Sequence, residues 1–209
     1  APQRAALCEF TGSAEPRIAR AAWEGLICLR SPLKDGEGKP DFLNGFESDE
    51  RRVRAATVLA ARVKLSEVFD GVQFSMRISD RVRLGLLMVR GFKGVNEWQA
   101  GSFNACLFLF ARAADPVTRL DAVRLLQKGL GDVHLVPGKA DTHDGFVAGA
   151  VDKVGAGIRK RMVERLAGGF PTGDEELDRE TGRLLAMLRA DSAGLLARVT
   201  DKWTESSLP

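Results

Sequence analysis

Hydrophobic residues recur at helical spacing along most of the chain, and the strongest of these patterns lie between residues 79 and 131. Residues 82–89 are apolar on nearly every side, so a helix here is expected to be buried. Residues 105–114 form the most apolar run, and residues 120–130 carry a more amphipathic pattern. The run at 105–114 is too short to span a bilayer. We therefore expect these helices to form the middle of a helical bundle.

Residues that cap or stop helices divide the chain into about eight or nine helical segments. Alternation at residues 72–78 is brief, and we interpret it as a turn because a lone strand would have no partner. The predicted fold class is therefore all-α, a multi-helix bundle. Helix starts are expected at Pro16, Ser48, Ser79, Pro116, Asp141 or Thr142, Thr172 (a capping box with Glu175) and Asp191.

Two stretches rich in glycine, proline and charged residues interrupt the helical patterns. Residues 31–46 predict a long exposed loop or a hinge, and residues 132–145 predict a second loop. The chain is therefore expected to form two helical subdomains. The first covers residues 1–131, including the loop at 31–46, and the second covers residues 132–209.

The first of these loops carries an apolar cluster formed by Phe42, Leu43 and Phe46. Such a cluster most often folds back onto its own domain, but it can also dock on a neighbouring molecule. We take these three residues as the candidate self-association site.

The charge balance is only mildly basic, with 31 Lys and Arg against 28 Asp and Glu in 209 residues. Any affinity for nucleic acid or membrane must therefore come from local clusters of charge. The three cysteines, Cys8, Cys28 and Cys106, lie far apart and are expected to be reduced and buried. No secretory signal pattern is visible at the N-terminus, so a reducing compartment is expected.

Basic residues cluster in three places along the chain. Such residues are often only the solvated face of a helix, but on one surface they could bind anionic membrane lipid or the phosphates of RNA. Aromatic residues are not interleaved with them and Tyr is absent, which favours a surface that reads charge over one that stacks bases. The candidate phosphate-binding residues are Arg51, Arg52, Arg54, Arg62, Lys64, Arg81, Arg83, Arg90, Lys93, Arg159, Lys160, Arg161 and Arg165.

No pattern of catalytic, metal-binding or cofactor-binding residues stands out. The only two histidines, His134 and His143, have too few potential ligands nearby for a metal site. The glycines at 149, 155 and 157 match neither a phosphate loop nor a dinucleotide-binding fingerprint. We therefore predict no catalytic residue, no metal and no cofactor.

The order of these signals from Leu59 to Met162 resembles the matrix protein family of influenza-like viruses, the orthomyxoviruses. The matching pieces are ARVKLSEVFDG, SDRVRLGLLMV, SFNACLFLFARAADPVTRLDAVRLLQKGL and GFVAGAVDKVGAGIRKRM, at residues 61–71, 79–89, 102–130 and 145–162. The family's basic segment for ribonucleoprotein binding and nuclear import would fall at the end of residues 120–130. This sequence holds only Arg124 and Lys128 there.

The resemblance implies a non-enzymatic viral matrix protein that self-associates beneath the envelope, binds anionic membrane lipid and bridges to the viral ribonucleoprotein. It implies a location in the virion and at membranes of the host cytoplasm, with the nucleus as an additional site. Two alternatives stay open: a nucleocapsid-like protein whose basic residues bind RNA, and a small helical enzyme or regulator that uses the loop from His134 to Asp144.

Overall fold

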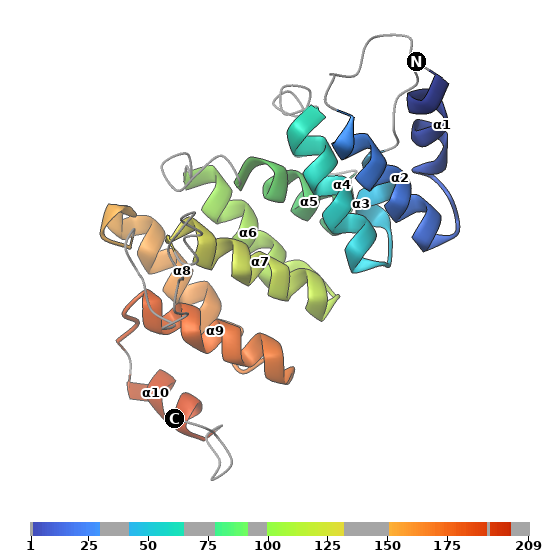
Figure 1. The fold of residues 1–209 in the computed structure, drawn as a ribbon. Coiled ribbons are helices and arrows are strands. Elements are labelled where there is room, and N and C mark those ends of the chain that lie inside the picture. The colour runs from blue at the N-terminus through green and yellow to red at the C-terminus, as the bar shows by residue number, and fades with distance from the viewer. Residues whose placement is uncertain are drawn as a thin grey trace, which may run out of the picture. The chain divides into compact units, whose positions relative to one another are not determined.

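A computed structural model of the chain describes residues 2–29, 42–64, 78–91, 100–131, 151–191 and 193–201. These residues form ten α-helices and a short 3-10 helix, with no strand among them, which confirms the all-α fold class (Figure 1). The chain divides into two compact units, an N-terminal unit (Ala1–Lys93) and a C-terminal unit (Gly94–Pro209).

The N-terminal unit packs five helices around an aromatic centre. Trp23 is fully buried, and its ring centroid lies 4.8 Å from that of Phe42. Phe46 belongs to the same cluster. Helix α2 packs on α1 and α4, and α3 packs on α4 and α5. The helices are α1 (Pro2–Phe10), α2 (Pro16–Cys28), α3 (Phe42–Glu47), α4 (Arg51–Lys64) and α5 (Asp80–Gly91).

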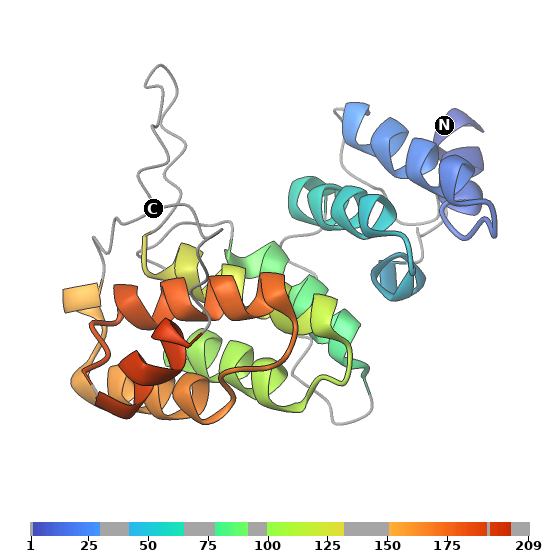
Figure 2. The ribbon, with the colours of Figure 1, turned by 90° about the horizontal axis from the view of Figure 1, so that it is seen from below.

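The C-terminal unit contains a ring of four packed helices, in which α7 contacts α6 and α9, and α8 contacts α6 and α9 (Figure 2). The last helix is joined to the α8 end by Arg198, whose Nη1 donates to the carbonyl oxygens of Ala167 and Phe170. The helices are α6 (Ala100–Arg112), α7 (Pro116–Gly129), α8 (Ala156–Gly168), α9 (Glu175–Met187) and α10 (Ala193–Thr200), with the 3-10 helix at Val151–Lys153.

The boundary between the units differs from the predicted one at residues 131 and 132. Helices α6 and α7 belong with α8 and α9, because α7 packs directly on α9. At that contact Gln127 Nε2 donates to the backbone oxygen of Glu180 at 3.1 Å, and Arg124 pairs with Glu176 at 2.6 Å. The helices before and after residues 132–150 therefore belong to one packed unit.

Several helix starts follow the local sequence signals. Asp115 caps α7 by accepting from the Val117 N–H, and Pro116 is the first helical residue. Ser79 Oγ accepts from the Val82 N–H at the start of α5. Pro16 is the first residue of α2, as predicted.

Other local predictions differ from the structure. Helix α9 is capped by Asp174, which accepts from the Leu177 N–H, and not by Thr172. Helix α3 lies within the segment predicted as a loop, and α1 lies where no helical period is visible. Residues 132–150, with both histidines and the predicted start at Asp141 or Thr142, lie outside the described residues, as do residues 30–41. Cys8 and Cys106 are buried, but Cys28 is exposed, contrary to the prediction, and all three are free thiols.

Candidate anion-binding surfaces

The exposed face of α8 gathers three cationic side chains in the C-terminal unit. On its inner side Met162 and Leu166 are fully buried, and this apolar contact fixes how the helix is turned. Lys160 and Arg161 are exposed and lie away from these two positions, and Arg165, three residues after Met162, is exposed at the border of the buried side. The helix therefore presents its cations to solvent because its opposite face is anchored in the core.

The basic side chains of α8, including Arg159, differ in the residues that they contact. Arg159 donates from Nε to the carbonyl oxygen of Leu188 at 2.9 Å, so it ties α8 to the end of α9. Lys160 lies 3.9 Å from the Glu164 carboxylate, a loose exposed pair. The side chains of Arg161 and Arg165 make no hydrogen bond or ion pair with any other residue that the structure describes. Both guanidinium groups are therefore available to an external anion.

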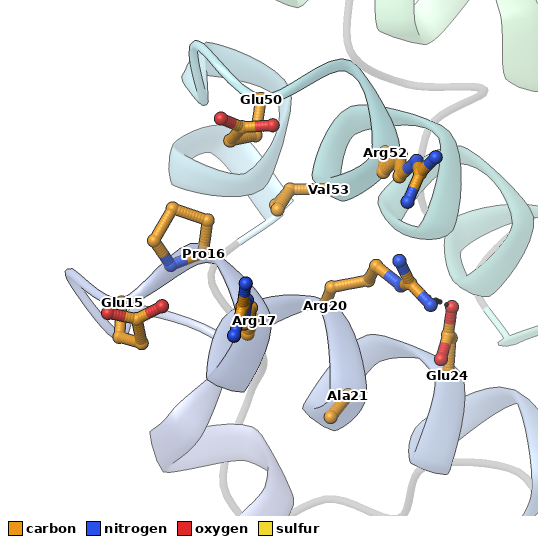
Figure 3. A pocket seen from close by; sticks show the side chains of 9 residues that line it. All are labelled: Glu15, Pro16, Arg17, Arg20, Ala21, Glu24, Glu50, Arg52 and Val53. Atoms are coloured by element: carbon orange, nitrogen blue, oxygen red, sulfur yellow. Dashed lines mark hydrogen bonds and ion pairs between the residues drawn. The ribbon is translucent and has the colours of Figure 1, made fainter.

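A groove of about 560 Å³ lies between α2 and α4 in the N-terminal unit (Figure 3). In Figure 3 Arg17 and Arg20 extend from α2 and Arg52 extends from α4, so three guanidinium groups face the same groove. Its lining residues are Glu15, Pro16, Arg17, Arg20, Ala21, Glu24, Glu50, Arg52 and Val53.

Only one of these three arginines has an acidic partner. Arg20 Nε lies 2.8 Å from Glu24 on the next turn of α2. Within the described part of the chain, the guanidinium groups of Arg17 and Arg52 form no hydrogen bond or ion pair. Sequence reasoning selected Arg52 but missed Arg17 and Arg20. Their three-residue spacing on one helix, with Glu24 four residues after Arg20, is the signal that could have found them.

Like Arg159, three more of the predicted phosphate-binding residues are buried or bonded within the fold. Arg83 is only 7% exposed, so it cannot lie on a binding surface. Arg54 donates to the carbonyl oxygens of Ser48 and Asp49, at 2.7 and 2.8 Å. Arg81 pairs with the Asp49 carboxylate at 2.6 Å. Arg54 and Arg81 thus hold the turn that leads into α4.

The remaining predicted cations fall in two groups. Arg51 is exposed on α4 but does not line the groove. The side chains of Arg62, Lys64 and Arg90, and the whole of Lys93, lie outside the described part of the chain.

The predicted self-association cluster is mostly buried. Phe42 is 7% and Phe46 is 1% exposed, because α3 turns both rings toward Trp23 and α4. They therefore form core and cannot dock on another molecule in this fold, which corrects the prediction for both. Leu43, on the opposite side of α3, is 52% exposed.

Burial also determines what other chemistry is accessible. Burial raises the pKa of the Cys106 thiol, so this group stays protonated at neutral pH. Within the described ranges, no three His, Cys, Asp or Glu side chains are grouped so as to hold a metal ion. None of the helices described there combines the length and apolar character needed to cross a bilayer.

Comparison with known proteins adds no relative: no family model, curated protein or solved structure matches the chain.

Proposed function

We propose that this protein is a structural, non-enzymatic protein of the viral matrix type that binds anionic membrane surfaces. The observation that supports this best is the exposed cationic face of α8, formed by Lys160, Arg161 and Arg165. Its two arginines have no intramolecular acidic partner among the described residues, so binding an anion through them breaks no ion pair, whereas Lys160 would exchange its loose contact with Glu164.

The shape of this face favours a membrane over a nucleic-acid strand. The cations project from one side of a single helix whose opposite side is anchored by Met162 and Leu166. Such a face can meet a planar array of lipid phosphates. A single strand would be bound better by aromatic side chains placed for base stacking, and α8 carries none.

The wider role rests on the resemblance to orthomyxovirus matrix proteins. We propose that the protein self-associates beneath a viral envelope and connects the membrane to the viral ribonucleoprotein. With Phe42 and Phe46 in the core, Leu43 is the member of the original cluster that can take part in self-association.

The test is flotation of nuclease-treated protein with vesicles of phosphatidylcholine alone or mixed with phosphatidylglycerol, over a series of salt concentrations. Each basic side chain near an anionic surface contributes about 1 kcal/mol, so the α8 face is worth about 3 kcal/mol. We expect the triple variant Lys160→Gln, Arg161→Gln, Arg165→Gln to bind anionic vesicles roughly a hundredfold more weakly.

Arg179→Gln is the matched control, because Arg179 is an exposed arginine of α9 outside the α8 face. We expect it to float like the wild type. Binding by the wild type should also fall as salt screens the charges. Equal flotation of the triple variant and the wild type would refute the proposal that the α8 face binds the membrane. Tight binding of single-stranded RNA without flotation would replace the membrane proposal with the nucleocapsid-like alternative.

A further inference from the structure

The chain bends between α9 and α10 at a residue that is poorly suited to the bend. Arg189 has a φ of 52°, in the left-handed region that is strained for residues with a Cβ. Its N–H donates to the carbonyl oxygen of Ala186 at 2.8 Å, and the N–H of Ala190 donates to that of Leu185 at 3.0 Å. This is a Schellman motif, in which glycine usually takes the left-handed position. The end of α9 is therefore strained at Arg189.

The local sequence favours a helix that continues through this bend. Residues 186–190 are all strong helix formers, and residues 175–200 contain no proline. Asp191 can cap a new helix, but it can also stand inside one at a modest cost. A side chain from another helix holds the bend, because Arg159 Nε donates to the carbonyl oxygen of Leu188 at 2.9 Å. Tertiary contact, and not a local stop signal, thus ends α9 here.

Helix α10 is joined to the C-terminal unit by a small contact. Each of α6–α9 packs along a neighbouring helix, whereas α10 has no comparable helix contact and lies at the edge of the unit (Figure 1). Leu195 is buried, and Arg198 donates to the carbonyl oxygens of Ala167 and Phe170 at 2.9 and 2.6 Å. Among the described residues, Leu195 and Arg198 therefore provide the main attachment of α10.

We propose that α10 exchanges between two copies of this chain. Each α10 then docks on the α8 end of the partner copy, while α9 and α10 become one continuous helix. The partner copy offers the same carbonyl oxygens to Arg198 and the same apolar site to Leu195, so exchange keeps these contacts. It also relieves the left-handed backbone at Arg189 in both copies, and short hinges under strain favour such exchange.

One contact opposes the exchange. A continuous helix uses the carbonyl oxygen of Leu188 for its own backbone hydrogen bond, so the bond from Arg159 would be lost. The balance between the closed and exchanged forms therefore depends on the backbone at Arg189. This inference deepens the self-association that the proposed function includes, because it names the segment that joins two copies.

The first test compares glycine and alanine at position 189, by sedimentation velocity of the full chain over a concentration series. Glycine removes the strain from the bend and disfavours the continuous helix, and both effects favour the monomer. Because a dimer contains two such bends, we expect Arg189→Gly to weaken dimerisation at least about a hundredfold.

Arg189→Ala is the matched control. It removes the same charge and the same exposed contact with Asp152, which is 3.4 Å long, but it keeps the strain and the helix propensity. We expect it to dimerise at least as tightly as the wild type. Arg189→Gly should also be at least as stable as the wild type, and thermal unfolding of the dilute protein checks this. Equal dimerisation of the two variants would overturn the inference.

A distance measurement distinguishes exchange from a dimer that uses another surface. Spin labels are placed on α8 and α10 through Glu164→Cys and Leu196→Cys, at two exposed positions, in a chain that also carries Cys28→Ser. The labelled protein is equilibrated with an excess of unlabelled protein. Exchange moves α10 away from the α8 of its own chain, so the distance seen in the monomer should disappear in the mixed dimer. Its persistence in the dimer would overturn the inference.

Neither measurement uses lipid, so their outcomes are separate from those of the flotation test. A dimer that keeps the monomer distance would contradict exchange and leave self-association through another surface. A wild-type chain that stays monomeric throughout the concentration series would contradict both exchange and self-association, without bearing on membrane binding. Absence of flotation would contradict the membrane function and leave exchange standing.

Discussion

A methyl group at Gly85 is expected to destabilise the N-terminal unit, because α5 meets the ring of Phe46 at this glycine. A Cβ built on Gly85 would lie 2.5 Å from Phe46 Cδ1 and 2.7 Å from Cγ. Real Cβ atoms essentially never approach other atoms so closely. Phe46 is 1% exposed and belongs to the cluster of Trp23 and Phe42, so the ring has little space into which to move.

The magnitude follows from two opposing terms. Overpacking a tight core costs about 1–3 kcal/mol, and a buried aromatic ring should place this site at the upper end. Alanine improves helix propensity over glycine by about 1 kcal/mol. We therefore expect Gly85→Ala to lower the free energy of unfolding by about 2 kcal/mol. For a unit of this size, that corresponds to a fall in melting temperature of roughly 8–16 °C.

Gly25→Ala is the matched control in the same unit. Its added Cβ would lie 3.1 Å from a methyl carbon of Leu7, a half-buried flexible side chain that can move aside. The gain in helix propensity should then offset most of the contact, so we expect a change within about 1 kcal/mol. Urea unfolding followed by circular dichroism compares the two variants.

A double variant isolates the contact itself. Phe46→Leu shortens the side chain opposite Gly85, so the added methyl should cost less in its presence than in the wild type. A Gly85→Ala protein as stable as the wild type, or an effect that Phe46→Leu leaves unchanged, would refute the packing of α3 on α5 through this ring.

Three further outcomes follow from single side chains. Asp178→Asn should lower the free energy of unfolding in urea by about 1.5–3 kcal/mol, because the Asp178 carboxylate accepts hydrogen bonds from the backbone N–H and the hydroxyl of Thr172. An unchanged urea midpoint would show that these two hydrogen bonds do not stabilise the fold. Iodoacetamide in mildly alkaline buffer should modify Cys28 in the folded protein and reach Cys106 only after unfolding, since burial raises the Cys106 pKa; peptide mass spectrometry reads both. Arg198→Met should speed amide exchange throughout α10 by removing its bonds to the carbonyl oxygens of Ala167 and Phe170, and unchanged exchange would show that other contacts hold this helix.

The sequence determined most of the helices and several of their ends. Asp115 with Pro116 and Ser79 act through hydrogen bonds and backbone angles within a few residues, so their effect can be read without the fold. The basic residues of α8 could also be identified from the sequence, because the apolar positions Met162 and Leu166 mark the face of the helix that is buried. Local chemistry and helical period were sufficient for these features.

Tertiary packing decided the features that depend on distant parts of the chain. Arg83 lies in a basic run yet is buried, and Phe42 and Phe46 lie in a polar stretch yet form the core with Trp23. The boundary between the units depends on α7 packing against α9, a contact of residues about fifty positions apart. The groove needs α2 beside α4, because only this places Arg17 opposite Arg52. Each of these features depends on packing between residues far apart in the sequence. No short stretch of sequence contains both partners of such a contact.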